Sequence, residues 1–250
     1  MKPVSFKSGK HTLRGFVHEP KQYDTAIVFL HGFPGHCEGK TAKSILPHLK
    51  EFLLLKFDFA GTDLSDGKFE DKLISKEVKD VKAAINFVAK TYKPKQIVLF
   101  GHSTGAINAA LYAYKDKRIK KIILAGGTGD LKRGVQYEFT PVQVKSLWEK
   151  GYFTYRRPGD WMHNKRVKKR YYDEFFKLDV LKSLRKFKGK TLVIHAENDE
   201  YVPKINADEL AQACRTKVIT IKNADHQFRR TGKATAKRIV TFILCENPGL

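Results

Sequence analysis

Short runs of consecutive apolar residues recur along this chain, and they alternate with stretches in which apolar residues are spaced three or four positions apart. The apolar runs are typical of parallel strands that are buried on both faces. They predict six strands, at residues 26–30, 52–57, 96–100, 119–125, 191–195 and 217–221. The spaced stretches predict helices, at residues 78–88, 107–113, 205–213 and 234–244.

Strands and helices in alternation imply parallel pairing with right-handed crossovers. The start of the chain differs, because residues 4–7 and 12–18 flank the turn Ser8-Gly9-Lys10 and predict an antiparallel hairpin at the edge of the sheet. The predicted fold class is therefore α/β, with a doubly wound and mostly parallel sheet.

Residues 128–188 interrupt this alternation with a segment that is much longer than an ordinary connection between strands and helices. The segment is rich in aromatic and basic residues, including the run KRVKKR at 165–170. We interpret it as an inserted, largely helical cap over the sheet. The sheet-forming core then consists of residues 1–127 and 189–250.

The composition fits one soluble domain, with 42% hydrophobic and 30% charged residues in 250. No apolar run is long enough to span a bilayer, and the N-terminus lacks the apolar segment of a secretory signal. Cys37, Cys214 and Cys245 are widely scattered, which disfavours a disulfide framework or a zinc site. We therefore expect a cytoplasmic protein that uses no metal or organic cofactor; nothing in the pattern indicates an oligomeric state.

The net charge of +22 is the one unusual bulk property. Such a surplus attracts nucleic acid, anionic membranes or acidic substrates, and it also serves solubility alone. Lysines are spread along the whole chain, so we expect no specific nucleic-acid partner. Residues 128–188 hold 16 basic and seven acidic residues, and their surplus of nine could draw in acidic substrates.

Residues 101–105, Gly-His-Ser-Thr-Gly, form the clearest catalytic motif. They follow a predicted strand and precede a predicted helix, which is the arrangement of a nucleophile elbow. The glycines allow the strained turn that exposes the serine, because side chains at these two positions would collide. Ser103 is the predicted nucleophile.

A serine hydroxyl needs a histidine to take its proton and a carboxylate to orient that histidine, and on this fold they follow in the order serine, acid, histidine. His163 lies in the cap and His195 lies inside an apolar strand, which leaves His226, in a loop at the carboxyl end of the sheet. For the acid, Asp199 is the first choice and Glu197 the runner-up. Asp225 adjoins His226 too closely to orient its ring and is interpreted as a turn residue.

An acyl-transfer site also needs two backbone N–H groups that stabilise an oxyanion. The elbow supplies one from Thr104. The sequence His31-Gly32-Phe33-Pro34-Gly35 follows a predicted strand and supplies the second, from the amide of Phe33. His31 and His102 are interpreted as structural.

Five motifs in order resemble the α/β-hydrolase family, and within it the serine esterases related to acylglycerol lipases and to cinnamoyl and feruloyl esterases. They are HGFPG at 31, FDFAGTDLSDG at 57, GHSTG at 101, ENDEYVP at 197 and ADHQF at 224. The resemblance implies Ser103, Asp199 and His226 as a triad, and Phe33 with Thr104 as the oxyanion hole. It also implies that residues 128–188 cover the substrate.

The predicted function is hydrolysis of small carboxylic esters with acyl or aryl-acyl groups of small to medium size, through an acyl-enzyme. A thioesterase or an aminopeptidase uses the same intermediate and stays an alternative. A different class of protein is the other alternative, in which the basic and aromatic cap binds nucleic acid or another polyanion.

Overall fold

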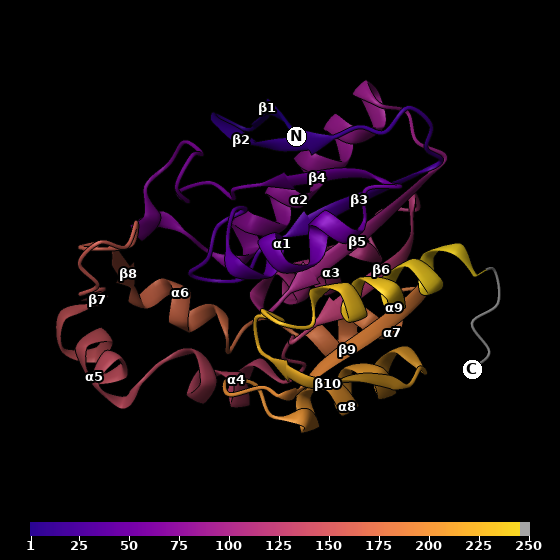
Figure 1. Ribbon diagram of the computed structural model, residues 1–250. Coiled ribbons are helices and arrows are strands. Elements are labelled where there is room, and N and C mark those ends of the chain that lie inside the picture. Colours follow the sequence, from indigo (N-terminus) through magenta and orange to yellow (C-terminus); the bar gives the residue numbers. More distant parts are fainter. Residues whose placement is uncertain (246–250) are drawn as a thin grey trace.

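The core of the protein is a single eight-stranded sheet (Figure 1). The computed structural model describes residues 1–245. The strands in spatial order are β1 (Lys2–Ser8), β2 (His11–His18), β4 (Leu53–Phe57), β3 (Thr25–Leu30), β5 (Gln96–His102), β6 (Ile119–Ala125), β9 (Lys190–Asn198) and β10 (Val218–Asp225). β2 runs antiparallel to β1 and to β4, and the other neighbouring pairs are parallel. The predicted hairpin and all six predicted core strands are confirmed.

Burial of the central strands explains their apolar sequence. Every residue of β3 and β4 is buried, which requires covering layers on both faces of the sheet. Successive side chains of β3 alternate between the two layers: Ala26, Val28 and Leu30 pack into one hydrophobic cluster, and Ile27 and Phe29 into the other.

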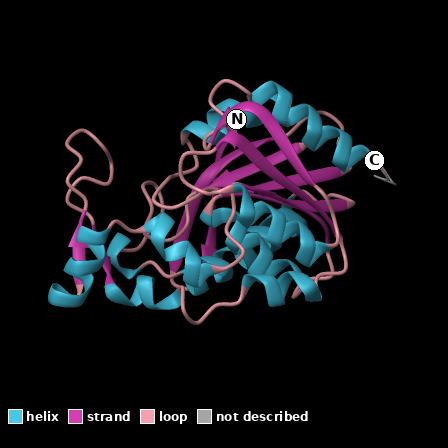
Figure 2. Cartoon of the chain, turned by 90° about the horizontal axis from the view of Figure 1, so that it is seen from below, coloured by secondary structure: helices cyan, strands magenta, loops and turns pink. Residues whose placement is uncertain are grey.

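Helices cover both faces of the sheet (Figure 2). One layer contains α2 (Ile74–Thr91), α3 (Thr104–Ala113), α7 (Val180–Lys186) and α8 (Lys204–Cys214), and the other contains α1 (Lys40–Ile45) and α9 (Gly232–Leu244). Two short 3₁₀ turns, η1 (Leu46–His48) and η2 (Phe69–Asp71), complete the core. The doubly wound architecture is thus confirmed. α1 was not predicted, because six residues are too few to display a helical period.

Three of the helices in the predicted cap segment and a small antiparallel ribbon lie beside the core (Figure 1). These are α4 (Leu131–Glu138), α5 (Pro141–Lys150), β7 (Tyr152–Thr154), β8 (Arg166–Lys168) and α6 (Lys169–Glu174). The ribbon adds strand structure to a segment expected to be largely helical. α7 lies within the same segment but packs against α3 and α8 of the core. The limits of the cap, 128–188, remain a prediction.

Aromatic rings hold the cap together and join it to the core. Phe139 meets Phe153, Tyr172 and Phe175 with ring centroids 5.3–6.2 Å apart. Tyr171 stacks on Phe33 of the loop after β3, with centroids 4.5 Å apart. These buried rings therefore build the interior of the cap and its contact with the loop that carries the predicted oxyanion hole.

Across residues 1–245, the structure contains no helix with the length and apolar character that crossing a bilayer requires.

Candidate active site

Ser103 stands on a sharp turn between β5 and α3. Its backbone angles, φ 54° and ψ −123°, lie outside the regions that side-chain-bearing residues ordinarily adopt. The flanking glycines make the turn possible: a Cβ atom on Gly101 would lie 2.2 Å from the carbonyl oxygen of Gly105, and one on Gly105 would lie 2.0 Å from that of Leu30. The sequence-based expectation of colliding side chains at these two positions is confirmed.

The hydroxyl of Ser103 does not cap the helix that follows it. Ser103 occupies the N-cap position of α3 but makes no side-chain capping bond. Its backbone N–H donates to the carbonyl of Ala125 at 2.8 Å, which ties the turn to the end of β6. Ser103 is half-buried between buried neighbours, and it lines a cavity at this end of the sheet.

His226 and Asp199 form a close pair at the carboxyl ends of β10 and β9. Nδ1 of His226 lies 2.9 Å from Oδ1 and 2.8 Å from Oδ2 of Asp199, and the Asp199 side chain is fully buried. Oδ1 also accepts the backbone N–H groups of Tyr201 and Val202, at 3.0 and 2.8 Å. Burial raises the pKa of Asp199, but the hydrogen bonds from His226 and from these amides outweigh it, so the net pKa is lowered. The carboxylate is ionised at neutral pH and holds the Nδ1–H tautomer of His226.

The rival acids make other contacts. Oε2 of Glu197 accepts the backbone N–H of Asn223 at 2.8 Å, and the Glu197 residue is exposed. Asp225 accepts the backbone N–H of Arg229 at 2.9 Å, as a turn residue does. Oε2 of Glu200 accepts the backbone N–H of His226 at 3.0 Å and so holds the loop. Of these carboxylates, Asp199 is the one at the His226 ring.

The two other candidate histidines lie elsewhere. His195 is buried within β9, and burial lowers the pKa of its ring, as for a core histidine. His163 lies in the cap, with its Nδ1 buried.

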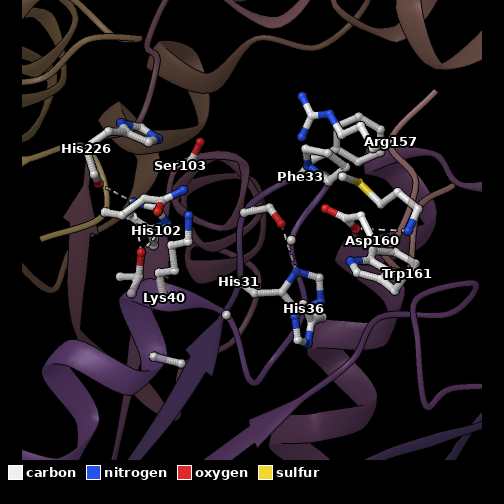
Figure 3. A pocket seen from close by; sticks show the side chains of 18 of the residues that line it. His31, Phe33, His36, Lys40, His102, Ser103, Arg157, Asp160, Trp161 and His226 are labelled. Atoms are coloured by element: carbon white, nitrogen blue, oxygen red, sulfur yellow. Dashed lines mark hydrogen bonds between the residues drawn. The ribbon is translucent and has the colours of Figure 1, made fainter. Parts of the chain in front are cut away.

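The loop after β3 brings Phe33 close to Ser103. A Cβ atom on Gly32 would lie 2.8 Å from Cβ of Ser103, so only glycine allows this approach. The amide of Phe33 follows directly. Thr104 is the first residue of α3, where backbone N–H groups have no partner within the helix. Figure 3 shows Ser103 between His226 on one side and Phe33 on the other.

His31 and His102 support the loops around the site. Nε2 of His31 accepts the backbone N–H of Phe59 at 3.3 Å, so its Nδ1 carries the proton and donates to the carbonyl of Gly32 at 2.9 Å. Nε2 of His102 donates to the carbonyl of His226 at 2.8 Å. Burial lowers the pKa of both rings to about 3, so both are neutral at pH 7. These contacts agree with the structural roles predicted for them.

A cavity of about 710 Å³ opens over Ser103 and His226. The β3 loop, the start of α1 and residues 157–162 of the cap line it (Figure 3). Among the hydrogen bonds of residues 1–245, none joins the Ser103 hydroxyl to the His226 ring, and Figure 3 draws no dashed line between them. In this conformation the two side chains line the same cavity without a hydrogen bond between them.

Several lining residues escaped the sequence analysis, among them Lys40, Gln227 and Trp161. Lys40 and Trp161 belong to none of the five motifs, and Gln227 lies in the motif at 224–228 without a predicted role; the position of all three depends on loop packing. Gly126 was missed as well, although a pair of glycines directly after β6 was a usable signal. A Cβ atom on Gly126 would lie 3.1 Å from Cε1 of His226 and 3.6 Å from Oδ2 of Asp199.

The part of the chain that the structure describes contains no cluster of three or more His, Cys, Asp or Glu side chains with the geometry of a metal site.

The fold and the elbow define a class of protein. Residues 25–157, more than half of the chain, match the alpha/beta hydrolase fold family, so the chain belongs to this family. It is similar to Polyketide transferase ATR5 from Stachybotrys chlorohalonatus, with 29% identity over 123 residues. This match covers 48% of the chain and 41% of the transferase, and so spans less than half the length of that protein.

Solved structures share the fold over almost the whole chain. Est1E from Butyrivibrio proteoclasticus with bound ferulic acid superposes with a TM-score of 0.82 at 21% identity, covering 96% of this chain and 98% of that one. Alpha/beta hydrolase domain-containing protein 10 from mouse superposes with a TM-score of 0.76 at 20% identity, covering 97% and 98%. At these identities the likeness concerns the fold.

Proposed function

We propose that the protein is a serine hydrolase that cleaves carboxylic esters of small to medium acyl or aryl-acyl groups. The carrying observation is that Ser103, strained on its elbow, shares a cavity with His226, whose Nδ1 lies 2.8 Å from Asp199. Strain, a histidine and an orienting carboxylate are what a serine nucleophile requires.

The proposed reaction begins when the Ser103 side chain rotates toward His226. Nε2 of His226 takes the hydroxyl proton while Oγ forms a bond to the ester carbonyl carbon, and the resulting oxyanion receives the N–H groups of Phe33 and Thr104. His226 then passes the proton to the departing alcohol, and the acyl group stays on Ser103. Water, deprotonated by His226, releases the carboxylic acid and restores the hydroxyl.

The size of the cavity and the surrounding rings support acyl or aryl-acyl groups of modest size. About 710 Å³ suits a drug-sized molecule. Trp161 lines the cavity, and Phe33 stacks on Tyr171 of the cap beside it. Residues 128–188 would then cover the substrate. The ferulic acid bound to Est1E fits the same proposal, as the acid product of an aryl-acyl ester.

The contacts of the basic cap run 165–170 weigh against a polyanion-binding function. Lys168 pairs with Glu70 at 2.9 Å, Lys169 with Asp173 at 2.6 Å, and Arg170 with Asp71. Arg166 lies over the ring of Tyr152 at 4.6 Å. Cations that already have acidic or aromatic partners offer less charge to a phosphate backbone.

The test compares wild type with Ser103→Ala on short-chain p-nitrophenyl esters, with Ser5→Ala as the control, since Ser5 is exposed on the edge strand β1. We expect turnover and covalent labelling by a fluorophosphonate in wild type and in Ser5→Ala, and neither in Ser103→Ala. Equal, negligible turnover in all three would remove the proposal. Matched thioester and amide substrates then rank the esterase against the thioesterase and aminopeptidase alternatives.

A further inference from the structure

Lys40 begins α1 and lines the cavity together with Ser103, His226 and Gln227. Its place is set by the next residue: Oγ1 of Thr41 lies 3.3 Å from Nδ1 of His102, and Nε2 of His102 donates to the carbonyl of His226 at 2.8 Å. Lys40 is therefore on the His226 side of the nucleophile. Figure 3 shows its side chain rising from below toward that side.

The ammonium group of Lys40 has no acidic partner among residues 1–245. The nearest acidic residue in sequence, Glu38, pairs with Lys56. Asp160 is the one acidic residue among the described residues that line the cavity, and its Oδ1 accepts the backbone N–H of Met162 at 3.0 Å. In Figure 3, Asp160 lies on the opposite side, between Phe33 and Trp161.

The direction of proton transfer decides which part of an ester meets Lys40. His226 must give its proton to the oxygen of the departing alcohol, so that oxygen lies beside the His226 ring. The alcohol part of the ester therefore extends over the His226 side of the cavity. There it meets the cation of Lys40 and the amide side chain of Gln227.

We propose that the alcohol part of the natural substrate carries an anionic oxygen group, a carboxylate or a phosphate, and that Lys40 binds it. An uncompensated ammonium at the edge of a cavity is a specific site for such a group, and the net charge of +22 adds a long-range field of the same sign. This inference rests on the proposed ester hydrolysis and assigns its substrate class.

The first test uses two esters that differ by one charge, 4-acetoxybenzoate and methyl 4-acetoxybenzoate. The measured quantity is the ratio of kcat/KM for the anionic ester to that for the neutral ester, because the ratio cancels any general loss of activity. We expect Lys40→Gln to lower this ratio about threefold to tenfold, mainly through KM, and Lys40→Glu to lower it further.

Lys43→Gln is the matched control, because Lys43 lies on the same helix, is exposed and does not line the cavity. It removes the same charge from the whole protein and should leave the ratio as in wild type. An equal ratio in wild type and in Lys40→Gln overturns the proposal. An equal fall in both lysine variants also overturns it, since only the general field would then act.

The second test measures binding and does not need turnover. Calorimetry on Ser103→Ala should give tighter binding of 4-hydroxybenzoate than of its methyl ester, and Lys40→Gln in the same background should abolish the difference. Phenyl phosphate, measured in parallel, distinguishes a phosphate from a carboxylate preference. Absence of any difference between the charged and neutral compounds overturns the inference, whereas failure of ester hydrolysis itself appears separately, as equal turnover in wild type and Ser103→Ala.

Discussion

Nδ1 of His226 lies 2.8 Å from Oδ2 of Asp199, although the two residues are 27 positions apart in the sequence. The intervening segment contains α8 and β10, which carry the chain down one face of the sheet and back through it, so that both loops end at the same edge. This return is the reason that a carboxylate from one loop can orient a histidine from the other.

Replacement of Asp199 by asparagine should separate chemistry from stability. The amide preserves the shape but favours the wrong tautomer of His226, so we expect kcat to fall about 10³-fold to 10⁴-fold with little change in Tm. Glu197→Gln is the control, because Glu197 contacts a backbone amide and should leave kcat within about twofold. Steady-state kinetics of both variants test which carboxylate orients His226. A larger loss of kcat in Glu197→Gln than in Asp199→Asn would assign that role to Glu197.

The two neutral buried histidines predict how stability depends on pH. Burial lowers the pKa of His31 and His102 to about 3, against 6.5 for an ordinary histidine. Between these values the unfolded chain binds protons that the folded protein does not bind. The contribution of each neutral ring to the free energy of unfolding is therefore complete above pH 6.5. It decreases as the pH drops below this value, by about 1.4 kcal/mol per pH unit for each ring.

Urea titrations between about pH 7 and about pH 5 measure this slope. His102→Gln should make the slope shallower, since one of the two buried rings is gone. His48→Gln, at an exposed position, should keep the slope of wild type. Identical slopes in all three proteins would contradict the assignment.

Gly105, two residues after Ser103, has no room for a side chain, so we expect its substitution to lower stability strongly. In Gly105→Ala the new Cβ would lie 2.0 Å from the carbonyl oxygen of Leu30, and backbone on both sides must move. We expect a loss of about 3 kcal/mol or more in the free energy of unfolding. Gly9→Ala meets nothing within 4 Å but has a φ of 56°, so it should cost about 1 kcal/mol. Chemical denaturation of both variants checks the order, and a smaller loss in Gly105→Ala than in Gly9→Ala would refute it.

Tyr171 predicts a link between the cap and catalysis. Its ring stacks on Phe33 at 4.5 Å, whereas its hydroxyl is buried and finds no hydrogen-bond partner among residues 1–245. Tyr171→Phe keeps the ring and removes the unsatisfied group, so stability should stay equal or rise by about 1 kcal/mol. Tyr171→Ala removes the support of the Phe33 loop and should lower both stability and kcat.

The readouts for Tyr171 are Tm and kcat with one soluble ester. If Tyr171→Phe lost as much activity as Tyr171→Ala, the hydroxyl rather than the ring would be the functional group, and the stacking argument would fail.

The sequence by itself determined the strands, the main helices and the identity of the site residues to be tested. Strands such as β3 can be predicted from their apolar runs, because a strand buried on both faces disfavours polar side chains along its length. The turn at Ser103 can be predicted from Gly101 and Gly105, because the turn leaves no room for side chains at these two positions. Such local constraints restrict which residue types can occur at a position, and the sequence therefore shows them.

Only the tertiary structure decided what depends on the meeting of distant segments. It placed Asp199 rather than Glu197 at the His226 ring: Glu197 lies at the exposed end of β9, whereas Asp199 follows the strand and turns inward, and the sequence does not show which of the two faces the ring. It also formed the β7–β8 ribbon within the cap and brought Lys40 to the edge of the cavity. A surface lysine has the same local sequence signature wherever it points, so its position relative to Ser103 is a property of the folded chain alone.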